Sequence, residues 1–162
     1  MIKTYDNFLS AEKCSLIRDQ IENNLFNLKN PQILNMRKEI SKFLNIPLDL
    51  QQDPFVIVNT EKNNSIENFF ESKEELKSKT AILYLNDDYE GGSIYFKHHL
   101  LYIEPKIGKL LVFDRLSEEF WKFKGQEKFY RLGWNPNMNY SILPIRKGKN
   151  FLLVIHFLNK ST

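Results

Sequence analysis

The chain has 162 residues, a formal net charge of +3 and a single cysteine. This length favours one domain, residues 1–162, and is sufficient to bury a core without disulfides or metals. Hydrophobic residues make up 42% of the sequence and aromatic residues 14%, which excludes an intrinsically disordered chain. The net charge is mild and the basic residues are scattered rather than clustered, so the composition argues against nucleic acid as a partner.

The only cysteine, Cys14, cannot form an internal disulfide, which is typical of a reducing compartment. The first residues lack the charged and apolar segments of a signal peptide. No run of apolar residues is long enough to span a bilayer. We therefore expect a cytoplasmic protein without a membrane partner.

Residues 1–50 are predicted to form a helical support. Ser10 can cap one helix, and apolar residues at helical spacing follow it. Asn30 can cap a second helix with Pro31 at its first position, and Pro47 marks its exit. Each amphipathic helix then needs a partner surface.

The core predicted for residues 54–158 consists of short strands rich in Val, Ile, Tyr and Phe. The runs lie at residues 55–58, 80–85, 93–96, 100–104, 109–113, 141–145 and 151–157. Helices followed by such strands predict an α+β domain, in which the helices cover one face of an antiparallel sandwich or barrel.

Residues 115–139 interrupt the strand spacing and contain both tryptophans. A connection of this length without structure of its own is unusual, so we expect an inserted short helix and an aromatic flap. The aromatic side chains alternate with Lys and Arg. They could fill the barrel as a plug, or they could stack on bases or grip a peptide.

Four phrases along the chain, taken in order, carry a family resemblance. They are "YDNFLSAEKCSLIRDQIE", "TAILYLNDDYEGGSIYF", "IEPKIGKLLVFD" and "LPIRKGKNFLLVIHF". Together they resemble the prolyl-4-hydroxylase-like branch of the 2-oxoglutarate and Fe(II) oxygenases, over nearly the whole chain. The resemblance implies a double-stranded β-helix, a jelly-roll barrel packed on the N-terminal helices.

The resemblance also implies a site in the barrel mouth. There a His-x-Asp pair and a distal His hold Fe(II), with positions left for 2-oxoglutarate and oxygen. In this sequence the three ligand positions fall on Asn68, Phe70 and Tyr140, and the chain has no histidine before His98. Asn and Tyr are poor Fe(II) ligands and Phe is none. Tyr84 matches a family Tyr that donates a hydrogen bond to 2-oxoglutarate.

The family also pairs the far carboxylate of 2-oxoglutarate with a Lys or Arg on the last long strand. That position falls on Lys149 or Asn150, depending on the direction of counting. Adjacent strand residues point to opposite faces, so only one can enter the barrel. Lys149 would keep an anion site, whereas Asn150, the choice we favour, would remove the cation.

A replacement metal site is conceivable from His98 or His99 together with His156 and Asp114. The alternative, which we favour, has His98 and His99 exposed in a turn and His156 hydrogen-bonded in the core. Asp114 would then cap a following helix.

Three functions are consistent with these residues. We favour a degenerate oxygenase fold, a pseudoenzyme with no expected cofactor, that binds a protein, a peptide or a small molecule or serves a structural role. The second is an active dioxygenase, a hydroxylase with displaced ligands that uses Fe(II) and 2-oxoglutarate. The third is a nucleic-acid-associated module that uses the basic aromatic flap.

Overall fold

The structure is a computed structural model that describes residues 1–63, 66–67, 77–123, 127–134 and 138–158. The helical elements are α1 (Ala11–Glu22), α2 (Pro31–Leu44) and the 3-10 turns η1 (Leu48–Leu50) and η2 (Lys97–His99). The strands are β1 (Ile2–Tyr5), β2 (Phe55–Thr60), β3 (Ile66–Glu67), β4 (Lys77–Tyr84), β5 (Glu90–Gly91), β6 (Ile94–Phe96), β7 (Leu101–Ile103), β8 (Leu110–Asp114), β9 (Leu116–Phe123), β10 (Glu127–Trp134), β11 (Tyr140–Ile142), β12 (Ile145–Lys147) and β13 (Lys149–Leu158).

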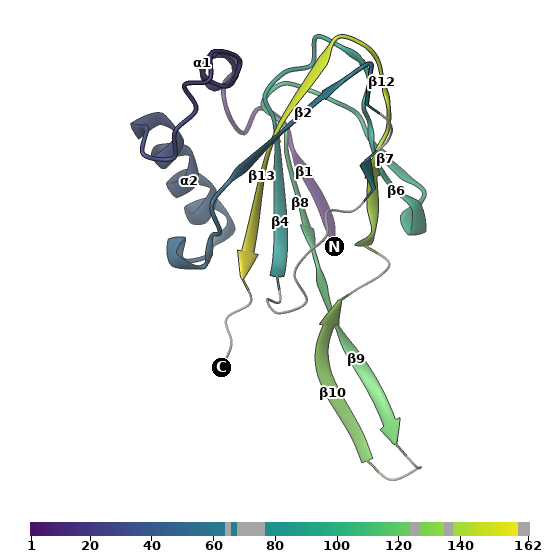
Figure 1. The fold of residues 1–162 in the computed structure, drawn as a ribbon. Coiled ribbons are helices and arrows are strands. Elements are labelled where there is room, and N and C mark those ends of the chain that lie inside the picture. Colours follow the sequence, from purple (N-terminus) through teal and green to yellow (C-terminus); the bar gives the residue numbers. More distant parts are fainter. Residues whose placement is uncertain (64–65, 68–76, 124–126, 135–137, 159–162) are drawn as a thin grey trace.

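Two antiparallel sheets form the body of the molecule. The larger has the order β1-β8-β4-β13-β2, and the smaller has the order β3-β11-β6-β7. The short strands β12 and β5 pair separately. The helices lie on the outer face of the larger sheet, and the smaller sheet lies on its other side (Figure 1). The predicted α+β class, with helices on one face, is confirmed.

Side-chain caps fix where the two helices begin. Ser10 accepts a hydrogen bond from the Lys13 N–H at 3.2 Å, and Asn30 accepts one from the Gln32 N–H at 2.9 Å. The second helix ends before Pro47, because Asn45 adopts a left-handed conformation with a φ of 54°. Neither described helix has the length and hydrophobicity required to span a bilayer.

Strand β13 is buried on both faces and separates two hydrophobic clusters. Leu153 and Ile155 pack toward the helices, whereas Leu152 and Val154 pack toward the smaller sheet. This alternation is the ordinary two-residue period of a strand. The space between the sheets is therefore the barrel interior, where the resemblance places a site.

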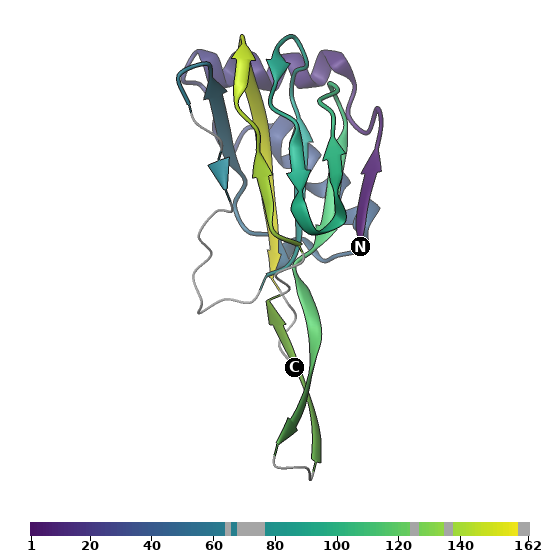
Figure 2. The same cartoon turned by 90° about the vertical axis from the view of Figure 1, so that its right-hand side faces the viewer.

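The expectation of a short helix within residues 115–139 is wrong. Strands β9 and β10 form a hairpin there, with Trp121 paired to Phe129, and it extends away from the body in both views (Figures 1 and 2). Asp114 consequently caps no helix, because the chain continues through Arg115 directly into β9. Aromatic residues favour strands over helices, and this preference prevails here. The aromatic plug or flap concerns side chains outside the described ones.

Two further details differ from the sequence expectation. Strand β1 was not predicted, and it pairs with β8, more than a hundred residues later in the chain. The run predicted at residues 141–145 is divided between β11 and β12 by Leu143 and Pro144. Pro cannot donate to a ladder, so a strand breaks there.

Candidate functional site

Strand pairing gathers three polar side chains, Asn59, Tyr84 and Asn150, at one end of the barrel interior. Asn150 lies opposite Asn59 on β2, and its neighbour on the same face, Leu152, lies opposite Tyr84. Directly paired residues point to the same face of a sheet, so the three polar side chains share the inner face. Tyr84 and Asn150 are fully buried and Asn59 is 4% exposed.

Tyr89 completes this group, which we call the amide–phenol cluster (Asn59, Tyr84, Tyr89 and Asn150). A Cβ atom placed on Gly92 would lie 3.0 Å from Tyr89 Cε2 and 3.1 Å from Asn150 Nδ2. The Tyr89 ring and the Asn150 amide therefore both approach Gly92, whose φ of +73° also favours glycine.

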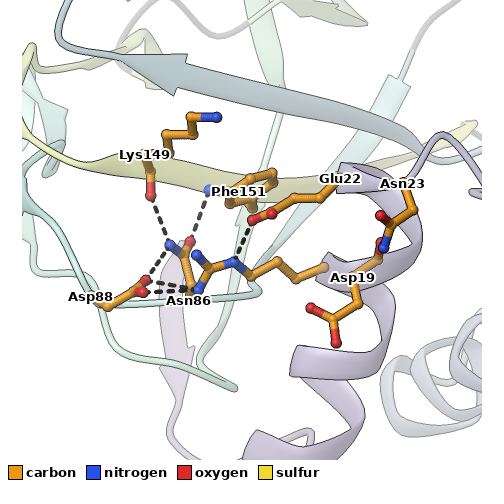
Figure 3. A network of polar contacts seen from close by, with 8 residues as sticks. Asp19, Glu22, Asn23, Asn86, Asp88, Lys149 and Phe151 are labelled. Carbon is orange, nitrogen blue, oxygen red and sulfur yellow. Dashed lines mark hydrogen bonds and ion pairs between the residues drawn. The ribbon is translucent and has the colours of Figure 1, made fainter.

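Asn86 determines which side chain of β13 enters the barrel. Its amide nitrogen donates to the Lys149 carbonyl at 2.7 Å, and its amide oxygen accepts from the Phe151 N–H at 2.8 Å (Figure 3). The backbone on both sides of Asn150 is thereby held by Asn86. Asn150 points into the barrel, and Lys149 is exposed.

An ion pair with helix α1 supports Asn86. Its amide nitrogen also donates to Asp88 at 2.7 Å, and Arg18 Nη1 donates to both Asp88 oxygens at 3.0 and 2.9 Å. The Arg18 guanidinium lies 5.1 Å from the centroid of the Phe151 ring. The helix, the turn after β4 and the start of β13 are therefore joined by one polar network.

Burial and nearby carboxylates raise the pKa values of the two phenols in the amide–phenol cluster. Burial raises the pKa of the Tyr84 phenol well above its usual value, and Tyr89 and Glu104 raise it further. Burial likewise raises the pKa of the Tyr89 phenol, together with Asp87 and Asp88. Both phenols stay protonated at neutral pH, so each can donate a hydrogen bond.

Tyr140 lies at the other end of the barrel interior, among aromatic rings. It is 4% exposed, and its ring centroid is 5.2 Å from that of Phe113 and 5.9 Å from that of Phe96. Arg115, which is 1% exposed, places its guanidinium carbon 5.6 Å from the Tyr140 centroid and 5.4 Å from the Phe113 centroid. A buried cation is thus held against the Tyr140 ring by cation–π contacts.

The structure does not bring together the candidates for a replacement metal site. His98 and His99 are exposed in η2, and His156 Nδ1 lies 2.8 Å from Thr80 Oγ1 in the buried interior. Asp114 forms ion pairs with the Met1 amino group and with Lys79. No group of three His, Cys, Asp or Glu side chains within the described ranges could hold a metal ion. The predicted ligand positions Asn68 and Phe70 lie outside the described residues.

Sequence reasoning missed Asn59, Asn86, Tyr89 and Arg115. Asn86 and Tyr89 lie within the quoted phrase, but their roles depend on contacts with strands far away in the sequence. Arg115 follows an apolar run and has the pattern of a solvated strand end. No local signal distinguishes it from an exposed Arg, because its burial depends on its contacts with Phe113 and Tyr140 in the tertiary structure.

The chain matches known proteins in its three-dimensional structure and not in its sequence. No family model matches the sequence, and no curated protein matches it. A viral collagen prolyl hydroxylase from Paramecium bursaria Chlorella virus-1 superposes with a TM-score of 0.74 at 17% identity, covering 99% of this chain and 90% of that one. The chain has the prolyl 4-hydroxylase fold. A second structure of the viral enzyme, in complex with 2-oxoglutarate, has a TM-score of 0.72 at 16% identity, covering 99% and 96% of the two chains.

A Pseudomonas putida prolyl-4-hydroxylase superposes with a TM-score of 0.61 at 14% identity, covering 99% of this chain and 93% of that one. The jelly-roll barrel expected from the sequence phrases is confirmed by these matches. At such identities the likeness shows the prolyl 4-hydroxylase fold and leaves the chemistry to the residues.

The residues described here do not fit the Fe(II) and 2-oxoglutarate that the prolyl 4-hydroxylase fold implies. At the distal ligand position, Tyr140 is enclosed by rings and faces the Arg115 guanidinium. A phenol enclosed in this way is a poor Fe(II) ligand beside imidazole and carboxylate. At the anchor position, the inward residue is the neutral Asn150, which cannot pair with a carboxylate as Lys or Arg does.

Proposed function

We propose that this chain uses the prolyl 4-hydroxylase barrel as a binding module without iron-dependent oxidation, in the cytoplasm. The observation that carries the proposal is Tyr140, whose ring centroid lies 5.9 Å from that of Phe96 and 5.2 Å from that of Phe113. Tyr140 stands where the resemblance places the distal iron ligand, and a phenol is a poor ligand for Fe(II) beside imidazole and carboxylate.

The interior instead provides contacts for a ligand. At one end, the amide–phenol cluster has buried hydrogen-bonding groups without a partner among the described residues, and at the other end Tyr140 packs with two Phe rings. An apolar enclosure with a few polar groups is the usual character of small-molecule sites. A small molecule is therefore the ligand that the described interior suits best.

Metal and co-substrate binding test this proposal directly. The protein is incubated anaerobically with Fe(II) and desalted, its iron is measured by mass spectrometry, and 2-oxoglutarate is titrated by calorimetry. We expect no stoichiometric iron and no saturable heat. The Pseudomonas putida enzyme, treated identically, is the positive control.

One iron per chain together with saturable 2-oxoglutarate binding would overturn the proposal and favour an active hydroxylase. Arg115→Gln serves as a control, because it removes a nearby charged group and leaves Tyr140 in place. We expect this variant to stay iron-free, since Tyr140 still replaces the distal His. Its folding is checked by far-UV circular dichroism.

A further inference from the structure

The amide–phenol cluster contains hydrogen-bonding groups that the described protein does not use. Within the cluster, the buried atoms without a hydrogen-bond partner among the described residues are Asn59 Nδ2, Tyr84 Oη, Tyr89 Oη, Asn150 Oδ1 and Asn150 Nδ2. Most buried polar side chains in proteins are bonded, and each unsatisfied group costs about 1–3 kcal/mol. Net stability is only about 5–15 kcal/mol, so such a cluster is a costly feature unless it serves a ligand.

A surface pocket of about 520 Å³ shares Gly92 with the surroundings of the cluster. Gly92 lines this pocket, and its Cα is also close to the Asn150 amide and the Tyr89 ring. Glu104 and Arg146 lie at the same pocket with opposite charges. Gly92 is therefore the point at which a small molecule would approach the cluster from outside.

Charge determines the kind of molecule that suits the cluster. Asn150 takes the inward position, and the neighbouring Lys149 is exposed on the other face. Glu104 raises the pKa of the Tyr84 phenol and Asp87 that of the Tyr89 phenol, so these carboxylates disfavour an anion there, whereas Asp88 is paired with Arg18. A primary carboxamide can pair with the Asn150 amide through one donated and one accepted hydrogen bond, and the phenols can supply another of either kind.

We propose that the amide–phenol cluster binds a small uncharged molecule through a carboxamide group and rejects 2-oxoglutarate. This inference rests on the proposed function, because it assigns a ligand class to a barrel that does not use iron. It extends that proposal by naming the chemistry that Asn150 selects.

Glutaramide and glutarate are matched probes, because they share a carbon skeleton and differ in charge. Both are titrated by calorimetry into metal-free protein kept in a chelator. We expect saturable glutaramide binding, with glutarate at least about tenfold weaker, which corresponds to about 1.4 kcal/mol. The side-chain amide resonance of Asn150 should shift during the glutaramide titration.

Variants at neighbouring positions locate the binding. Asn150→Leu removes both amide atoms and should abolish glutaramide binding, whereas Lys149→Asn alters the adjacent exposed side chain and should leave the affinity unchanged. Asn150→Lys should reverse the preference toward glutarate. Tyr89→Phe keeps the ring, loses one hydroxyl and should weaken glutaramide roughly three- to tenfold. It serves as the test if the Asn150 variants fail to fold.

The inference is overturned if the wild-type protein binds glutarate as tightly as glutaramide, or binds neither. It is equally overturned if folded Asn150→Leu keeps the wild-type glutaramide affinity. Because the titrations are done without metal, they are decided independently of iron uptake. Iron binding with an unchanged glutaramide preference would reject the proposed function and retain this inference.

Discussion

Asn86 is the residue on which the orientation of the candidate site depends. It is 2% exposed, and its single amide binds the Lys149 carbonyl, the Phe151 N–H and the Asp88 carboxylate. Two of these hydrogen bonds hold the start of β13 in one register, and the third joins Asn86 to Asp88. Asn86 therefore determines that Asn150 points into the barrel.

Replacing Asn86 with Ala should lower the free energy of unfolding by about 2–4 kcal/mol, because the substitution leaves buried backbone groups of Lys149 and Phe151 without this partner. Urea unfolding measures the loss. Asn35→Ala, at an exposed position on α2, is the matched control and should change stability little. A loss as small as that of the control would contradict the role assigned to Asn86.

Two carboxylates should make the fold sensitive to acid. Burial acts to raise the pKa of Asp88, but hydrogen bonds from Asn86 and Arg18 and the Arg18 charge outweigh it and lower the pKa. Burial opposes Lys79 and the Met1 amino group in the same way at Asp114, and its pKa is also lowered. A lowered folded pKa gives stability that is present above the unfolded value of about 3.9 and is lost as the pH falls through the folded value.

The double variant Asp88→Asn, Asp114→Asn should therefore lose less unfolding free energy than the wild type between about pH 5 and about pH 2. Both side chains are partly exposed, so we expect a modest difference. Urea unfolding across this pH range measures it. Asp49→Asn, exposed on η1, should behave like the wild type. Equal acid sensitivity of the double variant would count against these pairs.

The sequence alone favoured Asn150 as the residue that points into the barrel but did not exclude Lys149. Lys149 and Asn150 are one residue apart, and a one-residue change reverses the face of every side chain in a strand. The choice is made by Asn86, more than sixty residues earlier in the chain. Arg115 was missed for a similar reason, because only the tertiary arrangement shows that its guanidinium is buried between Phe113 and Tyr140.

At the scale of elements, the sequence predicted the features that depend on neighbouring residues, such as the helix starts. The caps Ser10 and Asn30 fix helix starts from within one turn, so the sequence located them correctly. Strand β1 was missed because it is short and its pairing partner β8 is distant in the sequence. The sequence predicted a short helix and an aromatic flap where the β9–β10 hairpin lies, because this segment shows no clear apolar period.

The hairpin should contribute little to the stability of the body. Strands β9 and β10 pair only with each other within the described chain, and a lone two-stranded hairpin is marginally stable in water. Replacing residues 117–133 with a short glycine-containing turn should change the free energy of unfolding by less than about 1 kcal/mol, the scale of loop-closure differences. Urea unfolding followed by far-UV circular dichroism tests this. A loss of several kcal/mol would mean that the hairpin anchors the body.

At the scale of the whole molecule, one sheet joins two hydrophobic clusters. The cluster between the two sheets positions the candidate site. The cluster between the larger sheet and the helices packs α1 against the sheet, and Arg18 of α1 binds Asp88. Because β13 contributes alternate residues to both, neither cluster can form without this strand. The barrel and its helical support should therefore fold as one cooperative unit.

Adjacent leucines on β13 test this cooperativity, because both are fully buried and they face opposite clusters. Leu152→Ala and Leu153→Ala should each lower the free energy of unfolding by about 2–5 kcal/mol through lost burial and a residual cavity. Far-UV and near-UV circular dichroism should give one coincident urea transition for each variant. Val58→Ala, 41% exposed on β2, is the control and should change stability much less. If Leu153→Ala separated an early loss of helix from a later loss of aromatic signal, the helices and the barrel would be independent units, and the link from Arg18 to Asn150 would lose its structural basis.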